Sequence, residues 1–183
     1  MTDGSRGAEG QTPEGTATHR REAQALGALR VAVLTVSDSR TEATDESGPL
    51  ARRLLREAGH EIARHALLPN DEPRVRALVQ EWLAAGDLHA IVITGGTGLG
   101  SKDRSIEAVT PLFEKEIPGF GELFRLLSYQ EQIGTTAILS RAAAGAAQGA
   151  VIVSLPGSSK AVELGLSRVL IPELRHLLRE IRK

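Results

Sequence analysis

Four short apolar runs recur along the chain, at residues 29–36, 61–68, 88–93 and 150–154. Three of them are almost continuously apolar and β-branched, whereas 61–68 alternates weakly. Runs of this kind and length are typical of strands covered on both faces, as in a parallel sheet. A polar turn and a segment with helical periodicity follow each run. The pattern therefore predicts an α/β domain built as a three-layer sandwich, with a mainly parallel sheet between helices.

The helices are predicted from apolar positions three or four residues apart. Expected helical segments are 50–58, the stretch between Pro73 and Gly86, 105–115, 118–132, 161–169 and 173–182. Pro111 marks a kink or break in one of them. Residues 136–141 are ambiguous, with an edge strand as one interpretation. Trp82 is expected in the core, and Phe120, Leu123 and Phe124 in the core or at a subunit interface.

The first 28 residues have almost no large apolar side chains. Such a segment buries too little surface to offset its ordering entropy, so residues 1–28 are predicted to be a disordered extension. Residues 29–183 form the predicted domain.

Composition excludes several classes of function. The net charge is −1, with 22 basic and 23 acidic residues, which argues against nucleic acid as a partner. The chain has no cysteine, so disulfides and thiolate metal sites are excluded. No apolar run approaches the roughly 18 residues of a membrane span, and no signal peptide is evident. We expect a cytoplasmic protein without a membrane partner, and no zinc site among the scattered histidines.

The third apolar run ends in the glycine-rich turn Thr94-Gly-Gly-Thr-Gly98, and Asp103 follows before the next helix. Such a turn exposes backbone N–H groups, which favour an anion such as phosphate. The hydroxyls of Thr94 and Thr97 and the Asp103 carboxylate add polar groups, and Asp103 could hold a metal ion. The turn matches neither G-x-G-x-x-G nor the P-loop.

Right-handed crossovers place all βα turns of a parallel sheet at one edge. Three polar turns, 37–40, 94–103 and 155–160, should therefore meet. Their convergence predicts a pocket for a polar small molecule that carries phosphate.

Several motifs follow one another in the order found in one family: TVSDSR (35–40), DESG (45–48), TGGTG (94–98), KD (102–103), EA (107–108), PGFGELFR (118–125), LSRA (139–142) and LPGS (155–158). Together they resemble the MoaB/Mog family of molybdenum cofactor biosynthesis proteins, and MoaB more closely than Mog. The resemblance covers residues 29–183. It implies a three-layer α/β domain that assembles as a homotrimer or homohexamer, with other enzymes of the pathway as possible partners.

The resemblance also implies an activity, the adenylylation of molybdopterin with ATP as co-substrate and Mg²⁺ as cofactor. By motif match, Gly95, Gly96, Thr97 and Gly98 would hold phosphate, and Ser37 and Asp38 would line the pterin or nucleotide pocket. Asp103 matches a carboxylate tied to magnesium and catalysis. Ser140, Arg141, Pro156, Gly157 and Ser158 would complete the rim.

Two departures from the family pattern bear on catalysis. The second functional carboxylate of the family falls on Asn70, an amide that can bind metal or water but cannot act as a base. Asp71 is a substitute one residue further on. The family's Arg-Asp-Val-Thr-Pro is replaced by 102–106 (KDRSI), and lysine lacks the bidentate fork of arginine. The alternative function is a molybdopterin-binding or carrier protein without turnover.

Some of these residues also have purely structural interpretations. Asn70, Asp71 and Asp103 precede helices and could serve as N-caps. Ser37 and Asp38 could be turn formers, and Arg141 could form an exposed ion pair. The small residues of 142–150 could pack closely between subunits.

Overall fold

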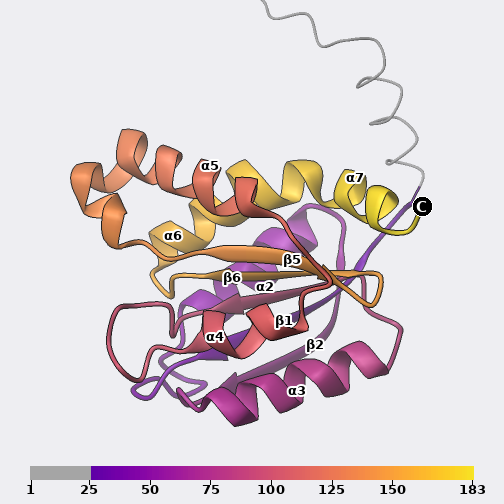
Figure 1. Cartoon of the computed structure of the whole chain (residues 1–183), viewed down its shortest axis with the longest axis horizontal. Coiled ribbons are helices and arrows are strands. Elements are labelled where there is room, and N and C mark those ends of the chain that lie inside the picture. Colours follow the sequence, from indigo (N-terminus) through magenta and orange to yellow (C-terminus); the bar gives the residue numbers. More distant parts are fainter. Residues whose placement is uncertain (1–25) are drawn as a thin grey trace, which may run out of the picture.

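The computed structural model describes residues 26–183 (Figure 1). Of the predicted disordered extension, residues 1–25 lie outside the described part. Leu26, Gly27 and Ala28 are exposed and lead into the first strand.

Six strands form one sheet in the order β2-β1-β3-β6-β5-β4. Their bounds are Arg30–Val36 (β1), Glu61–Leu68 (β2), Ala90–Thr94 (β3), Lys115–Glu116 (β4), Ala143–Ala147 (β5) and Ala150–Leu155 (β6). β2, β1, β3 and β6 are parallel to one another, whereas β5 runs antiparallel to β6 and β4 antiparallel to β5. The mainly parallel sheet is thus confirmed.

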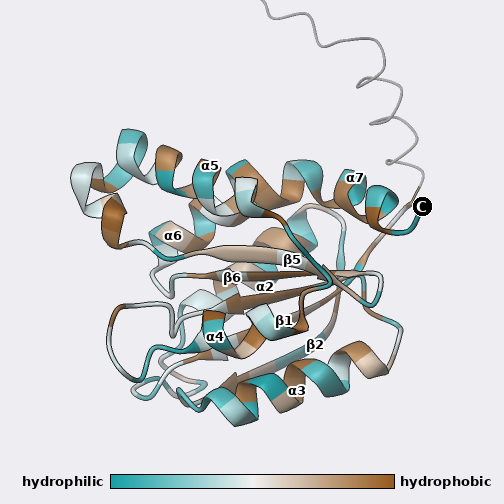
Figure 2. Ribbon diagram, viewed as in Figure 1, coloured by the Kyte–Doolittle hydropathy of each residue, from teal (hydrophilic) through white to brown (hydrophobic). Residues whose placement is uncertain are grey.

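Helices cover both faces of the sheet, which gives the predicted three layers (Figure 1). One face carries α3 (Glu72–Ala84) and α4 (Ser105–Val109), and the other carries α2 (Ser47–Glu57), α5 (Pro118–Ser128), α6 (Ser159–Leu164) and α7 (Ile171–Ile181). Figure 2 shows apolar strands through the middle and two-toned helices outside them. Along β1, Val31 and Val33 enter one core cluster, while Ala32 and Leu34 enter the other. This alternation explains why the strand is apolar at consecutive positions.

The predicted helix 105–115 is shorter than expected. α4 ends at Val109, a 3₁₀ turn covers Thr110–Leu112, and Lys115 already belongs to β4. Pro111 has no N–H to bond the carbonyl of Glu107 four residues earlier. That carbonyl accepts a hydrogen bond from Nη2 of Arg76 instead, at 3.0 Å.

The ambiguous segment 136–141 is not an edge strand, which was one interpretation of its sequence. Residues Gly134–Leu139 form a 3₁₀ helix, which follows α5 and a π-helical turn, Tyr129–Ile133. The sheet ends in β4 on this side and in β2 on the other.

The alanine-rich segment 142–150, whose small residues could have packed closely between subunits, instead packs within the chain's own fold. It supplies β5, between β6 and β4, and Ala144, Ala146 and Ala147 are buried in the chain's own fold. A Cβ on Gly145 would lie 2.3 Å from the ring of Phe113. The small residues therefore serve close packing within the subunit.

The C-terminal helices form a continuous run, because α6 passes through a π-helical segment, Gly165–Leu170, into α7. Trp82, Phe120 and Phe124 are buried as predicted, whereas the side chain of Leu123 is 43% exposed. No helix in the described part of the chain has the length and apolar character needed to span a bilayer.

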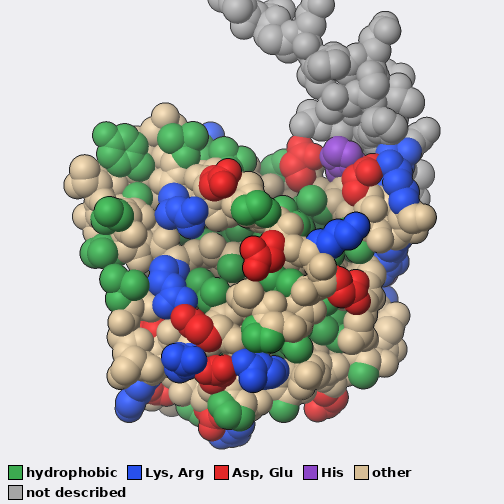
Figure 3. All heavy atoms as spheres, in the orientation of Figure 1, with side chains coloured by type: hydrophobic (Ala, Val, Ile, Leu, Met, Phe, Trp, Pro, Cys, Tyr) green, Lys and Arg blue, Asp and Glu red, His purple; other side chains and the backbone are tan. Residues whose placement is uncertain are grey.

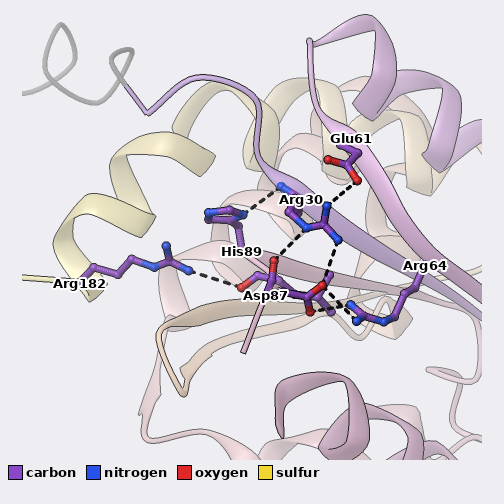
Figure 4. Close-up of polar contacts among 7 residues, drawn as sticks. Arg30, Glu61, Arg64, Asp87, His89 and Arg182 are labelled. Atoms are coloured by element: carbon purple, nitrogen blue, oxygen red, sulfur yellow. Dashed lines mark hydrogen bonds and ion pairs between the residues drawn. The ribbon is translucent and has the colours of Figure 1, made fainter. Parts of the chain in front are cut away.

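A network of charged side chains lies where the parallel strands β1, β2 and β3 begin, at the amino-terminal edge of the sheet (Figure 4). Asp87 accepts two hydrogen bonds from Arg64, at 2.8 and 3.1 Å, and one from Arg30, at 3.0 Å. Arg30 also reaches Glu61 at 2.7 Å. The hydrogen bond from Arg64, followed by that from Arg30, holds the pKa of Asp87 below its usual value.

Two histidines at the same edge accept hydrogen bonds from consecutive backbone N–H groups. Nδ1 of His60 bonds Leu29 N–H at 3.3 Å, and Nδ1 of His89 bonds Arg30 N–H at 2.9 Å. Burial, with the positive charge of Arg175 as the next cause, lowers the pKa of His60 to about 4. Burial lowers the pKa of His89 as well, so both rings are neutral acceptors that fix the start of β1.

Candidate functional site

The loops that follow β1, β3 and β6 meet at the carboxyl-terminal edge of the sheet, as predicted. The N–H of Gly95 donates to the carbonyl of Leu155 at 2.9 Å. A Cβ on Gly157 would lie 3.0 Å from the Cα of Gly95, so the two loops are in close contact. The N–H of Ser37 bonds Leu68 at 2.9 Å, which adds the end of β2.

Between these loops lies a pocket with a volume of about 390 Å³. Its walls include five of the predicted residues, namely Ser37, Gly95, Gly96, Gly157 and Ser158. They also include Thr35, Asp45 and Ser47, to which the sequence pattern assigned no role.

The conformation of Gly95 and Gly96 explains why the turn is glycine-rich. Their φ angles are +90° and +62°, a region that side chains rarely adopt. A Cβ at Gly95 would also lie 2.2 Å from the carbonyl oxygen of Val36. The turn therefore passes directly over the end of β1 and presents bare backbone to the pocket.

Asp45 organises the wall between β1 and α2. Its carboxylate accepts hydrogen bonds from the hydroxyl of Thr35 at 2.7 Å and from Ser47 Oγ and Gly48 N–H, both at 3.1 Å. Ser47 in turn pairs with Thr94 at 2.9 Å, which links α2 to β3. The signal in the sequence was an aspartate shortly before a predicted helix, which is also typical of an ordinary cap.

Asp38 and Asn70 form a pair across the ends of β1 and β2. The N–H of Asn70 donates to Oδ1 of Asp38 at 2.8 Å. The pKa of Asp38 is lowered by this backbone hydrogen bond, then by the side-chain amide of Asn70, and by the charge of Lys102. Because the amide N–H₂ group serves Asp38, Oδ1 of Asn70 is left for another donor.

That oxygen lies beside Gly96, where a Cβ would approach it to 2.5 Å and Oγ of Ser105 to 2.3 Å. Both oxygens are buried and have no hydrogen-bond partner among the described residues. Buried polar atoms in native proteins are nearly always satisfied, so this pair is suited to a water, an ion or a polar group of a ligand. Ser105 had not been identified from the sequence.

Asp71 has the structural role that was the alternative interpretation. It is the N-cap of α3 and accepts the N–H of Arg74 at 3.0 Å. Ser158 caps α6 in the same way through Ala161, at 3.3 Å.

Asp103 does not cap the next helix, whose N-cap is Arg104. Its Oδ2 accepts the N–H of Gly100 at 3.2 Å and would lie 2.6 Å from a Cβ on Gly98. Thr97, in the same loop, is buried. Asp103 thus contacts the glycine-rich loop at Gly98 and Gly100 and does not line the pocket.

Arg141 forms the ion pair that was the alternative to phosphate binding. It bonds Glu107 at 2.5 Å and the carbonyl of Gly98 at 3.1 Å. Burial alone would raise the pKa of Glu107, but its own backbone N–H and Arg141 together hold it below the usual value. Ser140 and Pro156 are partly exposed, and neither lines the pocket. Through these two contacts, Arg141 holds the glycine-rich turn in place at the carbonyl of Gly98.

Comparison with known proteins agrees with the sequence resemblance. A family model described as a probable molybdopterin binding domain matches residues 32–176. Molybdenum cofactor biosynthesis protein B of Bacillus subtilis strain 168 is 47% identical over 165 residues, which cover 90% of this chain and 96% of the relative. The protein of the same name from Staphylococcus carnosus strain TM300 is 50% identical over 157 residues, or 85% of this chain and 92% of the relative.

Solved structures give the same result. A crystal structure of a molybdenum cofactor biosynthesis protein B has a TM-score of 0.78 and 42% identity, covering 85% of this chain and 96% of that one. The tungsten cofactor synthesizing protein MoaB from Pyrococcus furiosus has a TM-score of 0.77 and 36% identity, covering 85% of this chain and 98% of that one. By sequence and by fold, the chain belongs to the family described as the probable molybdopterin binding domain, and it is similar to the molybdenum cofactor biosynthesis proteins B and to MoaB.

Proposed function

We propose that this protein acts in molybdenum cofactor biosynthesis as a molybdopterin adenylyltransferase that uses ATP and Mg²⁺. The observation that supports this most is the bare backbone of Gly95 and Gly96, which lines the pocket. Beside Gly96 lie the oxygens of Asn70 and Ser105, which have no partner among the described residues. The names of its relatives, molybdenum cofactor biosynthesis protein B, support the same pathway.

In this reaction an oxygen of the terminal phosphate of molybdopterin attacks the α-phosphorus of ATP. A new P–O bond forms as the bond to the β-phosphate breaks, and pyrophosphate leaves with the electron pair. The protein contributes by positioning and by neutralising charge, not by covalent chemistry. Backbone N–H groups of the glycine-rich turn bind phosphate oxygens, and Arg141 keeps that turn in place through the carbonyl of Gly98.

The residues present fit a magnesium ion that is held largely by its substrates. The described residues contain no group of three or more His, Cys, Asp or Glu side chains that could hold a metal. Mg²⁺ usually keeps several waters and takes one or two carboxylates together with substrate phosphates. Neither Asp103 nor Asn70 lines the pocket itself: Asp103, against Gly98 and Gly100, would supply a carboxylate, and Asn70, beside Gly96, a buried amide oxygen without a partner among the described residues. Bound there, the ion would neutralise phosphate charge during transfer.

The test is transfer of AMP from ATP to molybdopterin in the presence of Mg²⁺. The parent protein is compared with Asp103→Asn and with Asn70→Asp. Activity in the parent that is lost in Asp103→Asn supports the enzyme. The proposed enzyme is contradicted if the parent binds molybdopterin but neither the parent nor Asn70→Asp transfers AMP.

The second candidate is a molybdopterin-binding or carrier protein without turnover. It is favoured by Asn70, which gives the site an amide that cannot act as a base. Under this proposal, molybdopterin binds to the parent, and Asn70→Asp creates activity that the parent lacks. Full activity in the parent would exclude it.

We further propose that the protein is a homo-oligomer, a trimer or hexamer. Large hydrophobic side chains are exposed at Leu99, Leu123, Leu126, Tyr129, Ile133, Ile138 and Leu139. Figure 3 shows hydrophobic side chains gathered over α5 and the segment that follows it, at the upper left. Such clustering is typical of a protein contact. Light scattering should give an oligomer that Ile138→Glu dissociates and Leu26→Glu does not; a monomeric parent would contradict this.

A further inference from the structure

A second pocket, with a volume of about 200 Å³, adjoins the first and has no part in the proposed reaction. It lies between the first half of α2 and the edge strand β2. The two pockets share Thr35 and Asp45, whose hydrogen bond separates them.

The sheet topology explains why this pocket is open. β2 is the edge strand and pairs with β1 alone, so that His65 lies opposite Val33, and Leu67 opposite Thr35. The residues of β1 are buried after Arg30, whereas every residue of β2 is partly or fully exposed. α2 therefore covers β1 and leaves a groove with Val33, Ala66 and Leu67 at its apolar floor.

Two groups of opposite charge, Glu42 and Arg52, line this groove. Neither takes part in an ion pair with another described residue, and neither has a hydrogen bond there. The adjacent Arg53, by contrast, lies 3.8 Å from Glu57. Arg52 is half-buried on the wall of the pocket, so its donors and the acceptors of Glu42 are available to a ligand.

We propose that this groove binds the flat heterocycle of the substrate through an amino-oxo pyrimidine edge, the edge that pterin shares with guanine. The ring lies on the apolar floor, Arg52 donates to the ring carbonyl, and Glu42 accepts from the ring N–H and amino groups. This assignment rests on the proposed function, because it places the ring next to a phosphate bound by the glycine-rich turn.

The charges and the spacing support a ring rather than a second phosphate. Glu42 and Asp45 repel an anion, while a neutral ring with donors and acceptors matches both signs of charge. The pockets follow β1, with Val33 in one, Val36 in the other, and Thr35 in both. The three residue steps of strand from Val33 to Val36 span about 10 Å, which suits a phosphate several bonds away from a bicyclic ring.

The experiment measures binding of 6-hydroxymethylpterin by its fluorescence, with guanosine and adenosine as competitors. The variants are Arg52→Gln, Glu42→Gln and, as a matched control on the same helix, Arg53→Gln. Pyrophosphate binding to each variant, measured by calorimetry, reports on the first pocket. Thermal unfolding of each variant confirms that the fold is intact.

We expect Arg52→Gln and Glu42→Gln each to raise the Kd for the pterin roughly tenfold or more, since each removes a charged hydrogen-bond partner. Arg53→Gln should leave it unchanged, and pyrophosphate binding should be the same in all three. Guanosine should compete in the parent and adenosine should not.

Three results would overturn the assignment: equal effects of Arg52→Gln and Arg53→Gln, adenosine competing as well as guanosine, or no saturable pterin binding while pyrophosphate binds normally. These results are distinguishable from a failure of the proposed function. Normal pterin and pyrophosphate binding without AMP transfer would exclude the reaction and leave the ring site in place.

Discussion

Polar residues lie at both ends of the parallel strands, mostly charged side chains at the amino-terminal edge of the sheet and mostly amides and hydroxyls at the carboxyl-terminal edge, and the two sets differ in how they are partnered. At the amino-terminal edge, Arg30, Arg64 and Asp87 satisfy one another, and two histidines accept the N–H groups that begin β1 (Figure 4). At the carboxyl-terminal edge, the oxygens of Asn70 and Ser105 are buried beside Gly96 and have no partner within residues 26–183.

This difference separates stability from function. At the amino-terminal edge the ion pairs satisfy one another and fix the strands, and Nε2 of His60 is the one buried side-chain atom there without a partner among the described residues. At the other edge, unpartnered polar atoms lie beside bare backbone, which reduces stability and favours binding. Substitutions at the two edges should therefore have different consequences.

The largest effect is expected from Gly95→Ala at the carboxyl-terminal edge. The residue has φ +90°, and the new Cβ would meet the carbonyl oxygen of Val36 at 2.2 Å. Strain and overpacking together should lower the free energy of unfolding by about 2–5 kcal/mol and abolish phosphate binding.

Gly86→Ala is the matched control at the opposite edge. Its φ is +70°, but nothing lies within 4 Å of the new Cβ, so only the backbone cost of about 1–2 kcal/mol applies. Urea unfolding measures both variants. Equal losses would show that the close approach of the turn to β1 is absent.

The next largest effect is the pH dependence of the free energy of unfolding that comes from His60 at the amino-terminal edge. Its pKa is about 4 in the folded protein and 6.5 in an unfolded chain. The unfolded state therefore binds more protons between these values, and stability falls as pH drops from about 6.5 towards 4, by at most about 3 kcal/mol.

His60→Gln keeps an acceptor for Leu29 N–H but does not titrate, so its stability should vary less over this range. Urea unfolding of both proteins at several pH values gives the comparison. Parallel curves for the parent and the variant would exclude this role of His60.

Gly48→Ala tests the packing of α2 against the pocket wall. A Cβ there would meet Asp45 Oδ2 at 2.4 Å and Thr35 Oγ1 at 2.5 Å, so we expect a loss of about 1–3 kcal/mol. Gly119→Ala in α5 meets nothing within 4 Å and should be neutral or stabilising, because alanine favours helix. Thermal unfolding of both variants decides whether the contact between Asp45 and Gly48 is as tight as described.

The smallest effect is expected from Asp87→Asn. The variant keeps the shape of the side chain and removes the charge that Arg30 and Arg64 share, so the melting temperature should fall slightly, and less at high salt than at low salt. Glu57→Gln, which affects only the exposed pair with Arg53, should have no measurable effect. A drop for Asp87→Asn that is independent of salt would contradict an electrostatic origin.

Much of the fold was predictable because its strands are apolar on both faces. β1, β3 and β6 follow from that pattern, and right-handed crossovers then bring the loops after them together. β5 was not predictable, since Ala143–Ala147 lacks β-branched residues and becomes a strand only through its neighbours β6 and β4. α4 ends early because Pro111 cannot donate a hydrogen bond to the carbonyl of Glu107. Proline is visible in the sequence, but the donor that replaces it, Arg76, comes from another helix.

For the site, the glycine-rich turn was predictable from local chemistry alone. Asp45 and Ser105 were not, because an aspartate or serine near a helix start is usually a cap, and only the tertiary structure brings them to β1 and Asn70. The role of Arg141 depends in the same way on Glu107 and Gly98. The charged network at the other edge has no spacing signal, since Arg30, Arg64 and Asp87 are far apart in the sequence.

The most direct test of the functional difference between the two edges is amide hydrogen exchange of the full chain with and without molybdopterin. Slower exchange should appear in residues 95–103 and 156–159, and no change is expected around Arg30, Glu61 and His89. Protection confined to the amino-terminal edge, or none at residues 95–103 under saturating ligand, would contradict the account.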